Sequence, residues 1–205
     1  MQKIMFNDRY GLTYAVIDEI KNNTRRIEGG KQFQLAATAA EDFTYEEATG
    51  CIVMCCQGIE IFRHKCRYKV GEIVAVAQSY EQAYRQGNMD ADEAILRGLK
   101  YDPGMCNKIS VRAALMPHQI RITGIRCERL QDISDEECMK EGVVDVTYFK
   151  TEGRPYELFA LPRREHKETF NTPRQAFAAL IDKVSGRGTW DCNPWVIVYE
   201  FELVK

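Results

Sequence analysis

Apolar residues near the start of the chain recur at the spacing of an α-helix. Between residues 10 and 21 they stand four positions apart, which places them on one face. We expect this helix to end near Asn22 and Asn23, because Asn tolerates the left-handed backbone found at helix ends. The predicted face consists of Leu12, Val16 and Ile20.

Capping motifs predict two more helices in the second half of the chain. Ser134 and Glu137 have the spacing of a capping box, and Gly142 would end the helix that they open. Thr172 followed by Pro173 predicts another helix start, because Pro suits the first helical position. The apolar stripe of this last helix consists of Phe177, Leu180, Ile181 and Val184.

A hairpin and a buried strand are predicted in the first half. Residues 51–56 and 59–64 are rich in strand-forming residues and flank Gln57-Gly58, which is a typical turn pair. Residues 70–77 form a short apolar run between turn signals, which indicates a buried strand. These segments predict β-structure around a polar loop.

Alternating patterns predict three further strands, at 109–113, 119–129 and 195–204. Ile122 and Ile125 cannot share one face in simple alternation, and a bulge at Gly124 would bring them together. In the last strand large apolar residues alternate with acidic ones, which is typical of a half-buried strand.

Two polar stretches separate these elements. Residues 27–50 are small and polar and are predicted as an extended loop, and residues 81–108 as an excursion with a short helix. No internal repeat or flexible linker divides the chain. We therefore predict a single α+β domain spanning 1–205.

Composition excludes several classes of protein. With 45% hydrophobic and 28% charged residues the chain is ordinary for a folded protein, and a net charge of −2 excludes a broadly basic nucleic-acid-coating protein. The N-terminus is interrupted by Asn7, Asp8 and Arg9, so a signal peptide is not expected. No apolar run approaches the roughly 18 residues that span a bilayer. We expect a cytoplasmic protein without membrane attachment.

Four segments, taken in order, resemble the ASCH family of PUA-like domains. They are the Lys-x-x-Thr-x-Arg pattern at 21–26, the Gly71-Glu72 pair before a strand, the strand and helix at 120–142 ending in Glu141-Gly142, and the aromatic strand at 193–202. That family usually has Gly where this chain has Glu19, and Asn22 and Asn23 would supply the same backbone geometry.

The resemblance implies a fold and a set of insertions. It implies a small mixed β-barrel of the PUA-like kind, flanked by helices. The segments 27–66, 81–108 and 143–170 would be insertions into it, carrying the loops and the hairpin.

The resemblance also implies a ligand and, in one branch, a reaction. Such domains are proposed to bind RNA, nucleotides or nucleosides beside the Lys-x-x-Thr-x-Arg segment. Some small members are amidohydrolases that remove the acetyl group of N4-acetylcytidine with a Lys, a Thr and a Glu, which correspond here to Lys21, Thr24 and Glu141. Chemically, Thr is a poor nucleophile that needs a base, and Lys21 would serve only if neutral.

Basic and aromatic residues extend the predicted binding surface. Arg25, Arg26 and Arg121 offer planar donors for phosphate, and Tyr10 and Tyr80 could stack on a base. Arg126, Arg129, Trp190 and Trp195 are further candidates of the same two kinds. The alternative is that the arginines are solvated and the aromatics belong to the core, in which case the chain is a protein-interaction or structural module.

Zinc is the alternative suggested by the cysteines. Five residues of ligand type lie close together in sequence: Cys51, Cys55, Cys56, His64 and Cys66. They fall in strand-like runs without a Cys-x-x-Cys pair, so buried reduced thiols are the preferred interpretation and neither metal nor cofactor is expected. Phosphate-binding glycine loops are absent from the sequence.

Overall fold

The structure is a computed structural model that describes residues 1–147, 157–162 and 168–204. In these residues it contains seven α-helices, several short 3₁₀-helices and three β-sheets. The predicted α+β class is confirmed. None of the described helices has the length and apolarity needed to cross a membrane.

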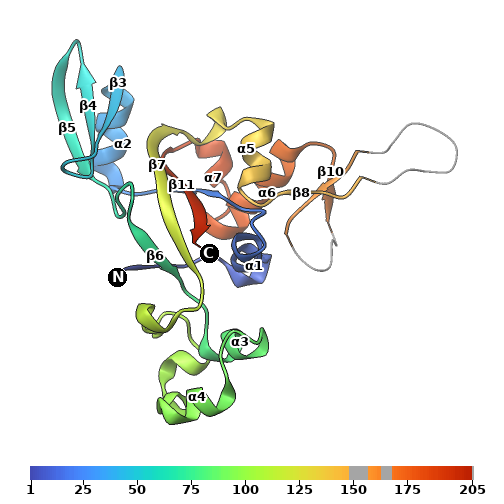
Figure 1. The fold of residues 1–205 in the computed structure, drawn as a ribbon. Coiled ribbons are helices and arrows are strands. Elements are labelled where there is room, and N and C mark those ends of the chain that lie inside the picture. Colours follow the sequence, from blue (N-terminus) through green and yellow to red (C-terminus); the bar gives the residue numbers. More distant parts are fainter. Residues whose placement is uncertain (148–156, 163–167, 205) are drawn as a thin grey trace, which may run out of the picture.

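A five-stranded sheet forms the centre of the protein (Figure 1). Its strands in spatial order are β1 (Lys3–Ile4), β6 (Ile73–Val76), β7 (Gln119–Arg129), β11 (Trp195–Val204) and β2 (Asn23–Arg26). The β1–β6 pair is parallel and the other pairs are antiparallel. The strands predicted within 70–77, 119–129 and 195–204 are therefore neighbours. Within the described residues the sheet is open and does not close into a barrel.

The pairing of β7 with β11 contains the predicted bulge. Gly124 pairs with Glu200 and Ile122 with Phe201, so one residue of β7 has no partner between them. This extra residue lets both Ile122 and Ile125 point into the core, where they are 0% and 8% exposed.

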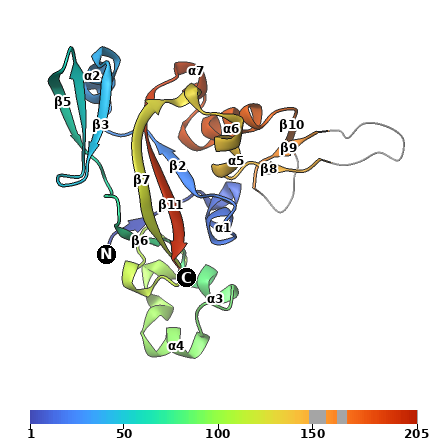
Figure 2. The same ribbon diagram turned by 45° about the horizontal axis from the view of Figure 1, so that its top comes forward.

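Two smaller sheets lie on either side of the central one (Figure 2). The first contains β3 (Asp42–Glu46), β4 (Cys51–Cys56) and β5 (Ile59–Lys65), and the second contains β8 (Val144–Asp145), β9 (Phe159–Ala160) and β10 (Thr169–Phe170). The β4–β5 hairpin was predicted, and it turns at Gln57 and Gly58, which have φ angles of 50° and 76°. The middle of the proposed insertion 143–170 lies outside the described residues.

The α-helices are distributed around the central sheet. They are α1 (Leu12–Ile17), α2 (Gly30–Ala39), α3 (Tyr80–Arg85), α4 (Ala91–Leu96), α5 (Asp135–Lys140), α6 (Pro173–Ser185) and α7 (Thr189–Cys192). Figures 1 and 2 show α2 with the β3–β5 sheet on one side of the β7–β11 pair and α5 to α7 on the other. The capping box of α5 and the Thr172–Pro173 start of α6 are confirmed.

The first helix is shorter than its sequence pattern predicted. It ends at Ile17, and Ile20 is 43% exposed instead of continuing the apolar face. Glu19, with a φ of 57°, supplies the left-handed turn that was expected from Asn22 and Asn23. The turn occurs early because the Lys21 N–H then donates to the Ala15 carbonyl oxygen at 2.8 Å, which closes the helix end.

Three further predictions about elements were wrong. Residues 27–50 are not a loop, because they contain α2 and β3; α2 buries only Phe33 and Ala37, a stripe too narrow to recognise in sequence. Residues 109–113 form no strand, and instead Lys3 Nζ holds the Ile109 and Val111 carbonyl oxygens at 2.5 and 2.7 Å. Val184 on α6 is 40% exposed.

Buried apolar residues form two separate clusters. The larger one surrounds the central sheet and includes residues of α1, α2, α5 and α6. The smaller one lies in the α3–α4 region and includes Tyr80, Leu99 and Met116. Figure 1 shows this region at the lower end of the sheet, so the excursion at 81–108 has a small core of its own.

Candidate active site

The segment before β2 is tied to three parts of the fold. The N–H of Asn22 donates to the carbonyl oxygen of Lys140 at the end of α5, at 3.0 Å. The carbonyl oxygen of Asn22 accepts from the N–H of Phe201 on β11 at 2.8 Å. Together with the Lys21–Ala15 bond, these contacts fix residues 21–23 between α1, α5 and the central sheet.

Lys21 and Glu141 form a buried pair at this junction. They are 2% and 4% exposed. Lys21 Nζ donates to the backbone carbonyl oxygen of Glu141 at 2.9 Å and to its carboxylate oxygen Oε2. Glu141 is the C-cap of α5, where a carboxylate opposes the helix dipole, and the ammonium of Lys21 offsets that repulsion. Two of the three residues predicted as catalytic are therefore in direct contact.

The environment of Lys21 changes its proton affinity. Burial lowers the pKa of Lys21 below its ordinary value, and this effect exceeds the opposing influence of Glu141. The positive charges of Arg26 and Arg25 lower the pKa of Lys21 further. A lysine in these surroundings is closer to the neutral form that a general base requires.

Thr24 is followed by a residue whose backbone contacts the Glu141 carboxylate. The backbone N–H of Arg25 donates to Glu141 Oε1 at 2.8 Å. Thr24 is 7% exposed and is the cross-strand partner of Tyr199. Within the described residues, the Thr24 hydroxyl makes no hydrogen bond with another group. The structure thus brings Lys21 and Glu141 into contact and places the backbone N–H of the residue after Thr24 on the same carboxylate.

Arg25 points to the opposite face of β2 from Thr24 and is surrounded by carboxylates. Its side chain is 0% exposed and forms ion pairs with Glu128 at 2.6 Å, Glu137 at 2.8 Å and Glu141 at 3.2 Å. Arg126 contacts Glu128 and Glu137 as well, and also Glu200. The donors of Arg25, which the sequence suggested for phosphate, are thus directed at side chains of the protein itself.

Arg26 lies on the same face of β2 as Thr24. It donates to the carbonyl oxygen of Met5 at 2.9 Å, while its Nε is buried and has no partner among the described residues. The guanidinium lies 5.8 Å from the centre of the Phe6 ring, and Lys21 Nζ lies 5.9 Å from the same ring. Lys21 and Arg26 therefore both lie close to the ring of Phe6.

The remaining predicted binding residues lie elsewhere. Tyr10 is buried in the larger cluster. Tyr80 is 0% exposed in the smaller cluster, and its hydroxyl oxygen accepts from the N–H of Arg112 at 2.9 Å. Arg121 is half-exposed on β7, 3.7 Å from Glu202. Trp190 and Trp195 are covered by arginines: Arg174 at 5.1 Å and Arg129 at 4.6 Å from their rings, respectively.

A second polar contact group joins the β3–β5 sheet to the central sheet. The Tyr199 hydroxyl donates to Glu28 Oε2 and accepts from the N–H of Arg67, both at 3.0 Å. His64 on β5 lies 3.7 Å from the same Glu28 oxygen and stacks edge-on against Phe33. Sequence reasoning missed this group and the Glu128–Glu137–Arg126 network, because their members are far apart along the chain.

The cysteines are free thiols in this structure. Cys51 and Cys66 are buried, and burial raises the pKa of Cys66 to about 12. Among the described residues no group of three or more His, Cys, Asp or Glu side chains is arranged to hold a metal ion.

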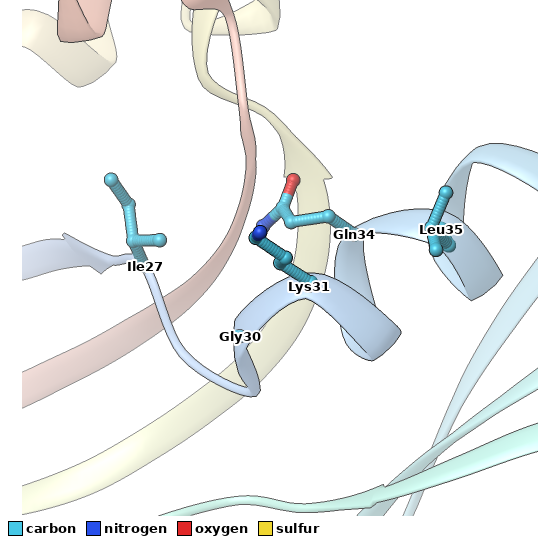
Figure 3. A pocket seen from close by; sticks show the side chains of 5 residues that line it. All are labelled: Ile27, Gly30, Lys31, Gln34 and Leu35. Carbon is cyan, nitrogen blue, oxygen red and sulfur yellow. The ribbon is translucent and has the colours of Figure 1, made fainter.

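An apolar depression opens on the surface at the start of α2 (Figure 3). It is lined by Ile27, Gly30, Lys31, Gln34 and Leu35. None of these residues belongs to the Lys21–Glu141 pair or to its charged surroundings, so the depression is separate from the candidate site.

Comparisons with known proteins identify no relative. Neither the family models, nor the curated proteins, nor the solved structures include one that matches this chain.

Proposed function

We propose that this protein is an ASCH-like domain that binds a nucleoside or nucleotide beside Lys21, Thr24 and Glu141 and hydrolyses an acylamino group of that ligand. The observation that carries the proposal is the buried Lys21–Glu141 pair, which lies against the peptide that joins Thr24 to Arg25. Buried titratable pairs of this kind concentrate at functional sites. An N4-acetylated cytidine is the substrate of the resembling enzymes and the first candidate here.

The PUA-like barrel is part of the same proposal. It is supported by the adjacency of β6, β7 and β11 and by the position of the Lys-x-x-Thr-x-Arg segment at the edge of their sheet. The three insertions would then account for the β3–β5 sheet, the α3–α4 region and the β8–β10 sheet.

A single proton transfer would prepare the site for hydrolysis. Moving one proton from Lys21 to Glu141 converts an ion pair into a neutral amine and a carboxylic acid. Burial favours the neutral arrangement, because it penalises both charges. The amine is then the base that Thr24 needs, and the acid is the donor that a departing amine needs.

The proposed reaction has two steps. Lys21 accepts the proton of the Thr24 hydroxyl as its oxygen attacks the acyl carbon, and Glu141 protonates the nitrogen that leaves. This forms an acyl ester on Thr24 and releases the free amine. Water, deprotonated by the Glu141 carboxylate that the first step leaves, then attacks the ester, while the Lys21 ammonium returns its proton to the departing Thr24 oxygen. A carboxylic acid is released, and the threonine hydroxyl, the neutral amine of Lys21 and the protonated Glu141 are restored. One amide and one water give one amine and one acid.

Binding of RNA without chemistry is the second candidate. It is favoured by Arg26, whose buried Nε has no partner among the described residues and would gain one if the side chain turned toward a phosphate or a base. It is also compatible with Arg121, which is half-exposed on β7. In this case Lys21 would act as a charged contact and not as a base.

Acetate release from N4-acetylcytidine tests the two candidates against each other. Lys21→Arg keeps the charge but cannot become neutral, so hydrolysis requires that this variant lose turnover while ligand affinity remains. Thr24→Val removes the hydroxyl at nearly constant shape, and Thr24→Ser should retain part of the activity. Wild-type protein that binds cytidine or RNA without releasing acetate would reject the hydrolase in favour of binding. Turnover that survives both Lys21→Arg and Thr24→Val would show that other residues carry the reaction.

A further inference from the structure

Arg25 connects the candidate site to a second layer of charged groups. Its backbone N–H and its Nη1 both donate to Glu141 Oε1, at 2.8 and 3.2 Å. The other carboxylate oxygen of Glu141, Oε2, contacts Lys21 Nζ. The two oxygens of this carboxylate therefore have different partners, Arg25 on one and Lys21 on the other.

Arg25 itself is held in place from three elements. Its Nε and Nη2 contact Glu128 on β7 and Glu137 on α5, and its backbone is part of β2. Arg126 on β7 also forms ion pairs with both glutamates, so each of them has a second positively charged partner besides Arg25. A side chain fixed in this way has little freedom to turn toward a ligand.

We infer that Arg25 is a positioning residue, which holds Glu141 through Oε1 so that Oε2 faces Lys21 and the proton of the pair can pass between them. The inference rests on the proposed function. It departs from the interpretation of Arg25 as a phosphate contact, because the guanidinium is 0% exposed and faces three carboxylates.

The charged neighbours support this role. Two cations, Lys21 and Arg25, contact the Glu141 carboxylate, and the Cys138 thiol lies within its electrostatic influence. Arg25 donates to Oε1 and Lys21 to Oε2. Two donors on Oε1 fix the orientation of the carboxylate, so that Oε2 stays directed at Lys21.

The first experiment separates positioning from ligand contact by kinetics. Arg25→Gln should lower kcat for N4-acetylcytidine by about 100-fold, as expected when a reacting group shifts by an ångström, and leave KM within about twofold. Arg126→Gln is the matched control: it removes the same charge from the same network without touching Glu141, and should cost much less. A raised KM with kcat retained in Arg25→Gln would overturn the inference, because it would mean that Arg25 binds the ligand.

The second experiment needs neither turnover nor a substitution. A nuclear magnetic resonance coupling across the hydrogen bond, from the Arg25 backbone nitrogen to the Glu141 carboxyl carbon, should be detectable in the wild-type protein. Absence of this coupling in a spectrum that resolves the backbone couplings of β2 would overturn the inference even if Arg25→Gln fails to fold. Wild-type protein without acetate release but with the coupling would reject the proposed hydrolysis and keep the geometry assigned to Arg25.

Discussion

Lys21 Nζ donates to the backbone carbonyl oxygen of Glu141 at 2.9 Å and to the carboxylate of the same residue, and both residues are almost completely buried. Lys21 thereby donates a hydrogen bond to the carbonyl oxygen at the C-terminal end of α5 and places a positive charge beside the carboxylate of its C-cap residue, Glu141. Burial of such a pair is expensive unless every donor and acceptor is used, and the Arg25 contacts use the remaining oxygen. Substitutions of Lys21 or Glu141 should therefore change the stability of the protein measurably.

Stability should depend on pH through Lys21. Its pKa is lowered in the folded state, whereas the unfolded chain keeps the proton up to the ordinary value of 10.5. Between the folded and unfolded values the unfolded state binds more protons, so the free energy of unfolding rises with pH in that window. We expect wild type to gain stability relative to Lys21→Met as pH rises from neutral toward 10.5. Urea titrations at several pH values measure this difference, and a flat or falling difference would contradict it.

Tyr199→Phe should weaken the attachment of the β3–β5 sheet. The hydroxyl of Tyr199 joins Glu28 to the N–H of Arg67, and its loss leaves both without that partner. We expect the free energy of unfolding to fall by about 1–3 kcal/mol. Tyr45→Phe is a comparison variant, since its hydroxyl accepts from the N–H of Val70 in a half-buried position and should cost less. Equal costs for the two variants would contradict the role given to Tyr199.

The β4–β5 turn should be improved by a single substitution. Gln57 adopts a φ of 50°, a left-handed conformation that Asn tolerates better than Gln, and Gly58 follows with 76°. Gln57→Asn is expected to raise the free energy of unfolding by about 0.5–1 kcal/mol. Gly58→Ala should lower it, since an alanine Cβ is strained at that φ. Calorimetric unfolding of the two variants should therefore give shifts of opposite sign.

Two glycines with ordinary φ should respond differently to alanine. A Cβ at Gly104 would lie 2.6 Å from the ring of Tyr80 in the smaller core, where the ring has no room to move. A Cβ at Gly124 would lie 2.7 Å from Oε2 of Glu200, and that half-exposed carboxylate can turn away at the cost of its ion pair with Arg126. Gly104→Ala should cost about 1–3 kcal/mol and Gly124→Ala less than about 1 kcal/mol. The reverse order in denaturant titrations would show that the bulge, not the small core, is the tighter site.

Local sequence signals predicted the elements that local chemistry controls. The capping box at Ser134, the Thr172–Pro173 helix start, the Gln57-Gly58 hairpin and the bulge at Gly124 all depend on residues within a few positions of one another. Local patterns were misleading where contacts with distant segments decide the structure. Ile20 continues the apolar spacing of the first helix in the sequence, but the chain turns at Glu19 and leaves Ile20 half-exposed.

The sequence by itself determined which residues are candidates, and the tertiary structure decided what each of them faces. The candidates Lys21, Thr24 and Glu141 came from a motif, but the contact between Lys21 and Glu141 depends on α5 ending against the segment before β2, which no local pattern specifies. The two adjacent arginines show the same division. Arg25 and Arg26 are adjacent residues of the same type, but side chains alternate between the two faces of a strand. Arg25 therefore forms ion pairs with three carboxylates, whereas Arg26 lies near the ring of Phe6. A side chain's charge is set by its own chemistry, whereas its partners are set by packing between segments that are far apart in the chain.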